Sequence, residues 1–229
     1  MCETIRAAGV CRLVLSGRWL ATGTDGGYRD GDASYIASVP DGFKRTDLGA
    51  YATERLEAAG FARDGPVLLT GVDADAARGA RAGSVTVVAT AGLSNPARLP
   101  VDPGREATAG GAGGPRPPGT VNLLVATSRA LSDGTLATLL ATAVEAKTAT
   151  LQTTTGFSGT TTDAAAVGSG GDDPAEFAGS ATDLGAATRV CVRDAVLASL
   201  DAAGEEPPAS VADAEYGVVT DGTADLFRP

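Results

Sequence analysis

The 229-residue sequence contains no histidine. This absence excludes Ser-His-Asp and Cys-His catalytic sites, and it excludes zinc sites that need an imidazole ligand. The few cysteines, Cys2, Cys11 and Cys191, follow no paired spacing and leave one over. We expect them to be reduced thiols that form no disulfide and bind no metal. The sequence therefore predicts a protein that needs no metal ion and no other cofactor.

Lysine is almost absent, since only Lys44 and Lys147 occur. The 28 acidic residues outnumber the 18 basic ones, which gives a net charge of −10. Nucleic acids and anionic membranes are bound by basic patches, so we expect neither as a partner. An acidic, lysine-poor surface fits a protein that stays soluble at high salt, and we expect a halophilic source.

Long apolar runs are also missing. No segment approaches the roughly 20 apolar residues that cross a bilayer, and Arg12 and Arg18 interrupt the apolar stretch near the N-terminus. That stretch therefore lacks the apolar core of a signal peptide. We expect a soluble, cytoplasmic protein.

Two loops carry partial ligand-binding patterns. Asp25, Asp30 and Asp32 lie in a Gly-rich stretch, but the closing Glu of an EF-hand loop is missing. The run GGAGGP at 110–115 lacks the Lys of a phosphate-binding loop. Both stretches are expected to be solvent-exposed loops.

The remaining composition is that of a globular protein, with 43% hydrophobic residues but only 4% aromatic ones. Ala, Val and Leu must therefore fill the core. β-Branched runs bounded by turn residues predict strands within 34–40, 65–73, 83–96, 120–127 and 159–170, and a pair of strands within 11–22 joined by a turn at 16–17. The stretch 23–33 is typical of a loop. Helical spacing and capping residues predict helices within 46–61, 132–152 and 181–204.

Strands and helices mix along the chain, which favours one compact mixed α and β domain over a doubly wound sheet. We expect this domain to span residues 1–204 and to contain a flexible Gly/Pro-rich loop at 102–118. Residues 205–229 are expected to form an acidic, partly ordered tail. The sequence leaves open whether the chain forms a homo-oligomer.

The chemistry left to a chain without histidine includes attack by a Ser or Thr hydroxyl. Such a hydroxyl needs a base, which can be a lysine, a carboxylate, or the amine of the Thr itself if the chain is cut before it. At Gly119-Thr120 a flexible Gly/Pro-rich loop gives way to an apolar strand, which makes Thr120 a candidate nucleophile. Lys147 is then a candidate base. Both residues also have ordinary interpretations, as a β-branched residue that opens a strand and a helix lysine at the core edge.

Four segments together resemble the adenosylcobinamide amidohydrolases: ATAGLSNPAR, GTVNLLVATSRALSDGTLATLLATAVEAKTATLQ, GTTTDAAAVGSG and FAGSATDLGAATRVCVRDAV. The resemblance covers most of residues 16–203. It implies hydrolysis of the amide that joins aminopropanol to the corrin ring of adenosylcobinamide, which yields adenosylcobyric acid for cobalamin salvage. The small-molecule partner would then be a corrinoid.

Residues 119–169 also resemble, more faintly, the second segment of ornithine acetyltransferases and β-peptidyl aminopeptidases. This likeness implies two stacked β-sheets flanked by helices, an α/β/β/α-like order. It also implies a nucleophile at Thr120, and the proteins it resembles cut themselves before that residue. The Pro117-Pro118 pair stiffens the approach to the bond, and we predict an intact chain in which Thr120 acts through a side-chain base, with Lys147 as the first candidate.

The resulting enzyme hypothesis has a catalytic set and a substrate-binding set. Asn122 shares a strand face with Thr120, whereas Glu145 and Lys147, two apart on a helix, do not share a face. The catalytic set is Thr120, Asn122, Lys147 and Glu145, and the substrate-binding set is Gly92, Ser94, Asn95, Thr160, Thr162 and Asp163. The Gly turn at 92–95 would supply backbone N–H groups to an oxyanion. The competing hypotheses are a corrinoid-binding module without catalysis and an acyltransferase of the ornithine acetyltransferase type.

Overall fold

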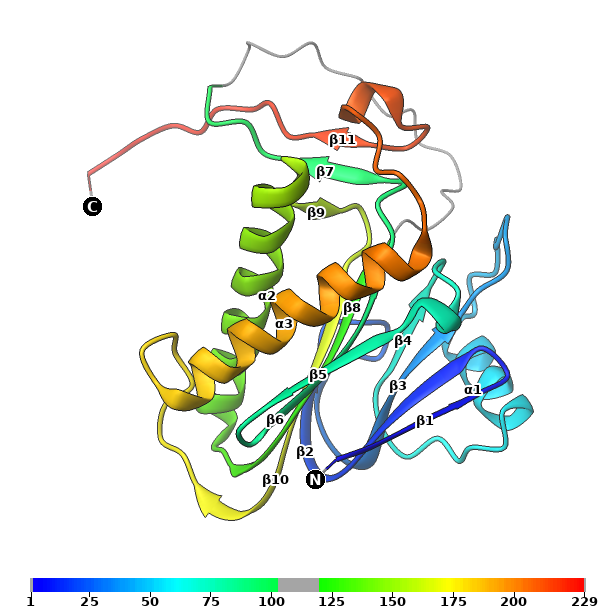
Figure 1. Cartoon of the computed structure of the whole chain (residues 1–229), viewed down its shortest axis with the longest axis vertical. Helices are drawn as coiled ribbons and strands as arrows, with labels where there is room; N and C mark the ends of the chain where they lie inside the picture. The colour runs from blue at the N-terminus through cyan, green and yellow to red at the C-terminus, as the bar shows by residue number, and fades with distance from the viewer. Residues whose placement is uncertain (1, 103–119, 229) are drawn as a thin grey trace.

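The computed structural model describes residues 2–102 and 120–228. Gly119 and residues 103–118 of the predicted loop lie outside this part. Figure 1 shows the elements in chain order: β1 Glu3–Ala7, β2 Val10–Ala21, β3 Gly27–Ser38, α1 Leu48–Ala58, β4 Val67–Thr70, β5 Arg78–Ala82, β6 Val85–Ala91, β7 Pro96–Arg98, β8 Val121–Ala130, α2 Asp133–Thr155, β9 Gly159–Thr160, β10 Ala164–Pro174, α3 Asp183–Ala203 and β11 Val218–Val219, with short 3-10 turns at Ala74–Ala76 and Val211–Asp213.

Eight of the described strands form one hydrogen-bonded sheet in the order β4-β3-β2-β10-β8-β6-β5, with β1 added to β2. The β3–β4 and β8–β10 pairs are parallel, and the others are antiparallel. A separate small sheet, β11-β7-β9, lies at one end of the molecule. The core packs against the faces of the large sheet, and the small sheet lies next to the start of β8.

The large sheet folds back on itself at β2. The first half of β2 pairs with β1, the second half pairs with β10, and its register with β3 shifts between Val14 and Gly17. As a result β4 lies over β8, although three strands separate them within the sheet. Asn122 Nδ2 of β8 donates to the carbonyl oxygen of Leu69 in β4 at 2.8 Å. One continuous sheet therefore forms two stacked β-layers.

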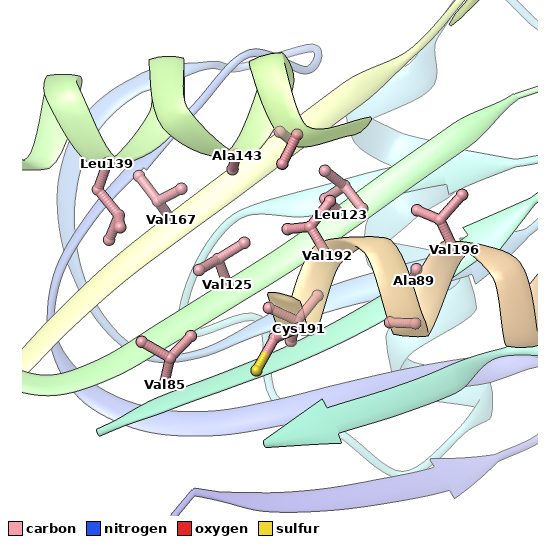
Figure 2. Close-up of a cluster of buried hydrophobic side chains, with 14 of the residues drawn as sticks. Val85, Ala89, Leu123, Val125, Leu139, Ala143, Val167, Cys191, Val192 and Val196 are labelled. Atoms are coloured by element: carbon pink, nitrogen blue, oxygen red, sulfur yellow. The ribbon is translucent and has the colours of Figure 1, made fainter. Parts of the chain in front are cut away.

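Three apolar clusters fill the spaces between four layers. Because side chains alternate along a strand, Leu123 and Val125 of β8 face the helices while Leu124 and Ala126 face the second β-layer. Figure 2 shows the first cluster, in which α2 and α3 cover one face of the sheet. The second cluster lies between the β-layers and includes Trp19. The third packs α1 on the outer face of β2, β3 and β4.

The predicted mixed fold with stacked β-layers between helices is confirmed, and so are the three helices. Ser132 caps α2 by accepting a hydrogen bond from the Thr135 N–H, and Gly204 ends α3 in the left-handed conformation with φ 66°. No helix in the described ranges is long and apolar enough to cross a membrane.

Three predictions about strands were wrong in detail. Residues 11–22 form one bulged strand, not two, because both halves remain paired with β3. β3 begins at Gly27, inside the predicted loop, because its polar residues pair with β2 without any apolar alternation. The predicted strand at 159–170 is divided into β9 and β10 by a turn at Asp163. β1, β5, β7 and β11 were not predicted.

Candidate active site

Thr120 lies directly before β8, where the small sheet meets the large one. Its side chain is buried, and its Oγ1 lies 2.7 Å from Oγ1 of Thr162. Thr162 belongs to the turn between β9 and β10, which approaches Thr120 because β8 and β10 run parallel. The fold therefore brings together two hydroxyl groups that are 42 residues apart in the chain.

Asp163 is the most highly connected group of this cluster. Its carboxylate accepts hydrogen bonds from the Val121 N–H at 2.9 Å and from the Thr160 N–H at 3.1 Å. It also accepts the Thr160 hydroxyl and the ammonium group of Lys147. An ionised carboxylate has about four lone-pair positions, so these donors saturate it. Asp163 consequently fixes the start of β8 to the β9–β10 turn.

Lys147 reaches this cluster from the buried face of α2. Its side chain is only 8% exposed, and its ammonium group pairs with Asp163. A buried charge of this kind is tolerated because a counter-charge lies beside it. Gly159 leaves room for the Lys147–Asp163 ion pair beside the backbone of β9, since a Cβ there would lie 2.5 Å from Asp163 Oδ2 and 3.2 Å from Lys147 Nζ. Among the described residues, Lys147 makes no hydrogen bond to Thr120.

A cleft of about 520 Å³ opens beside this cluster. Its lining has an apolar part and a part rich in hydroxyl groups, and it includes Lys44. Lys147 is not in the lining but pairs with Asp163, which is, so both lysines of the chain lie near the cleft. Lys44 has no ion-pair partner among the described residues, whereas the guanidinium of Arg45 is engaged by Asp47 and Glu54. The lining residues are Thr22, Gly23, Thr24, Val39, Phe43, Lys44, Arg45, Thr46, Leu48, Val67, Leu68, Leu69, Thr120, Thr162, Asp163 and Ala164.

Asn122 lies one pleat below Thr120 on the same face of β8. Its side chain is fully buried, and its Nδ2 donates a hydrogen bond to the carbonyl oxygen of Leu69, a residue that lines the cleft. Its Oδ1 has no hydrogen-bond partner in the described part of the chain. An unpaired buried amide oxygen is uncommon in folded proteins. The position is therefore suited to hold a buried water or a donor of a ligand.

The other predicted site residues are not all in this cluster. The Gly92 N–H donates to the carbonyl oxygen of Thr120 at 3.2 Å, so that donor is already engaged. Gly92 and Ser94 line a different pocket of about 290 Å³. Asn95 is buried, and its carbonyl oxygen accepts the Thr161 N–H.

Glu145 is separate from the cluster as well. It lies on the exposed side of α2 and pairs with Arg189 of α3. This follows the expectation that residues 145 and 147 do not share a helix face.

The far side of the cleft is formed by residues 22–24, which lie in a stretch with a loose family resemblance, and by residues within 39–48, which no sequence pattern predicted as part of a site. Phe43 and Lys44 belong to a loop without any recognisable motif. The available signal was the rarity of lysine: in a chain that otherwise uses Arg, the two lysines lie near one cleft.

Comparison with known proteins assigns the chain to a family. A family model described as adenosylcobinamide amidohydrolase matches residues 6–208. A curated adenosylcobinamide amidohydrolase from Halobacterium salinarum is 52% identical over 235 aligned residues that cover all of both chains. The match spans every element of the site described above, and the chain belongs to the adenosylcobinamide amidohydrolase family.

Proposed function

We propose that the protein hydrolyses the amide between aminopropanol and the corrin ring of adenosylcobinamide and so releases adenosylcobyric acid for cobalamin salvage. The family assignment supports this substrate. The observation that carries the proposal is the pairing of a buried Thr hydroxyl with a second hydroxyl beside a cleft, in a chain without histidine.

In the proposed reaction, Thr120 Oγ1 attacks the carbonyl carbon of the scissile amide. A C–O bond forms, the C–N bond breaks, and the proton of the hydroxyl leaves on the amine of aminopropanol. A water molecule then hydrolyses the ester, which restores Thr120 and gives the carboxylate product. Dividing one difficult step into two easier ones is the general advantage of a covalent nucleophile.

Lys147 is the candidate base, a role that requires its neutral amine, so the ammonium group that pairs with Asp163 must first give up a proton to Asp163 or to water. Its ammonium group contacts Asp163, which is the chain neighbour of Thr162. The Thr120 hydroxyl contacts Thr162 and not Lys147 among the described residues, so we propose that the proton reaches Lys147 through an intervening hydroxyl or water. Asp163, Thr160 and Asn122 act as positioning residues in this scheme, because their contacts fix β8, the β9–β10 turn and the floor of the cleft.

The size of the cleft suggests how the substrate lies. Pockets of about 300–1,000 Å³ enclose a drug-sized ligand, and a corrin ring with its amide arms and nucleoside is larger than that. We infer that the cleft receives the scissile arm while the macrocycle stays outside, near Lys44 and Thr24. The apolar wall would then contact the propanol methyl group. Gly92 and Ser94 line a different pocket and Asn95 contacts the β9–β10 turn through its carbonyl oxygen, so these residues would act through the backbone.

We propose that the protein works in a salt-rich cytoplasm. The net charge of −10 and the halobacterial relative support this setting. An acidic surface keeps a protein soluble where salt screens charge repulsion over a few ångströms.

The central test is turnover of adenosylcobinamide in concentrated KCl, followed by mass spectrometry of the products. We expect wild-type protein to form adenosylcobyric acid, Thr120→Ala to lose more than about 10³-fold in kcat, and Thr120→Ser to retain part of it. Thr153→Ala is the matched control, because the Thr153 hydroxyl bonds only within α2. Binding of the corrinoid without turnover would favour the non-catalytic module. Full activity in Thr120→Ala would show that Thr120 has only a structural role at the start of β8.

A further inference from the structure

The C-terminal segment of residues 209–220 lies beyond the residues 6–208 that the family model matches. It leaves α3, crosses the end of the molecule and adds β11 to the small sheet (Figure 1). Val218 and Val219 pair in parallel with Ala97 and Arg98 of β7, and the Thr220 N–H donates to the carbonyl oxygen of Arg98 at 2.9 Å. The segment is thus held to the small sheet through the two residues of β11.

Tight packing holds the segment in place. Val211 is 4% exposed. A Cβ at Gly217 would lie 2.5 Å from Val211 Cγ1 and 2.8 Å from the Val211 carbonyl oxygen. The absence of a side chain at Gly217 therefore lets the chain fold closely over Val211 as it enters β11. Further along, Gly222 has open space around it, with no atom within 4 Å of an added Cβ.

The small sheet connects this segment to the catalytic cluster. β7 pairs with β9, where Pro96 is opposite Thr160 and Ala97 is opposite Gly159. The Thr160 N–H and hydroxyl both donate to Asp163, which in turn binds Lys147 and the Val121 N–H. Each strand of the path β11–β7–β9 is only two or three residues long. Isolated short strand pairs are marginally stable in water, so β7 and β9 need the third strand.

We propose that the C-terminal segment is a positioning element for the reaction. By completing the small sheet, it holds Thr160 and the β9–β10 turn in place, and Asp163 can then hold Lys147 and the start of β8, with Thr120, in their relative positions. This inference rests on the proposed function for its kinetic consequences. Its structural part, the ordering of Thr160 and Val121 by β11, stands without it.

The experiment compares Gly217→Val with the matched control Gly222→Val in the full-length protein. We expect Gly217→Val to lower kcat by about 10- to 100-fold with little change in KM, because a displacement of about 1 Å at a catalytic group has such an effect. Gly222→Val is expected to stay within about twofold of wild type. Deletion of residues 209–229 is expected to match Gly217→Val, and deletion of residues 222–229 is expected to match the control.

A double-mutant cycle shows whether the effect passes through Asp163. In an Asp163→Asn background, Gly217→Val is expected to cost less than about twofold, because coupled positions give non-additive losses. Equal losses in both backgrounds would overturn the proposal.

Hydrogen exchange supplies a readout that needs no turnover. We expect faster exchange in Gly217→Val in the peptides that contain Thr160 and Val121, while peptides of α3 and β6 keep wild-type protection. Uniformly faster exchange, or unchanged exchange at Thr160, would overturn the positioning role. If wild-type protein fails to hydrolyse adenosylcobinamide, the proposed function fails, and the exchange data alone decide the structural part.

Discussion

Among single residues, Lys147 has the most unusual environment. Its ammonium group is buried against Asp163, whose other lone pairs are taken by Val121 and Thr160. Two roles are compatible with this contact: a base that receives the proton of Thr120, or a cation that only holds Asp163 in place. The two roles differ in what an arginine would do at this position.

We predict that Lys147→Arg loses at least about 100-fold in kcat, whereas the protein remains folded. Arginine keeps the ion pair but cannot be deprotonated in a protein, so it fails as a base. Steady-state turnover together with circular dichroism checks this, and Lys147→Met, which leaves Asp163 unpaired, is expected to lose stability as well. An active Lys147→Arg would show that Lys147 serves as the cation that holds Asp163, and intact-mass measurement would then test whether the amine of Thr120 is the base, since cleavage gives two fragments that part after Gly119.

Part of this site could be predicted from the sequence because local patterns and the family resemblance cover it. Thr120, Thr162, Asp163 and Lys147 lie in recognisable segments, and the structure joins them in one cluster. The contact between Asp163 and the Val121 N–H could not be foreseen, since it depends on the parallel register of β8 and β10. Phe43 and Lys44 were missed for the same reason, because only the fold places their loop at the cleft.

At the scale of elements, the contact between β2 and β10 determines how closely the two β-layers pack. Gly168 of β10 lies opposite Trp19 of β2, and a Cβ at Gly168 would approach the indole ring to 2.6 Å. Trp19 is fully buried, and its Nε1 donates to the carbonyl oxygen of Leu15. The ring therefore has little freedom to move away.

We predict that Gly168→Ala lowers the free energy of unfolding by about 1–3 kcal/mol, the usual cost of overpacking a core. Chemical denaturation in high salt measures this. Gly179→Ala is the matched control, because no atom lies within 4 Å of an added Cβ at that position. A loss no larger than that of the control would mean that the indole ring repacks freely.

The elements themselves were predictable to different degrees. The three helices carry apolar spacing and caps such as Ser132, so the sequence predicts their ends to within a few residues. Strand β3 was half hidden because residues 27–33 are stabilised by pairing with β2 and not by burial of alternate side chains. The short strands β7 and β11 have no sequence signal, since two or three residues show no period.

At the scale of the whole molecule, the buried ionisable groups make the free energy of unfolding fall as the pH becomes alkaline. Burial raises the pKa of the Cys11 thiol to about 11, and nearby Arg6 lowers it slightly. The unfolded thiol has a pKa of about 8.5. Because the folded value is the higher one, the contribution of neutral Cys11 to stability is complete below about pH 8.5 and is lost as the pH rises toward 11.

We predict that the free energy of unfolding of the wild type falls between pH 9 and 11 more steeply than that of Cys11→Ala, by up to about 1.4 kcal/mol per pH unit. Denaturant titrations at three pH values in this window measure the difference. Tyr35, whose pKa is raised by burial and by Asp64, contributes equally to both proteins. Parallel curves for the two proteins would show that Cys11 ionises in the folded state as easily as in the unfolded chain.

The position of β2 in the large sheet has a consequence for how the chain folds during synthesis. β2 is made early, yet its second half pairs with residues 166–169 of β10, which leave the ribosome more than a hundred residues later. Until then the second half of β2 lacks its β10 neighbour, and a nascent chain with such an open strand edge is prone to aggregate. Non-local strand pairing of this kind also slows folding. The refolding rate of the protein is therefore expected to be set by the pairing of β2 with β10.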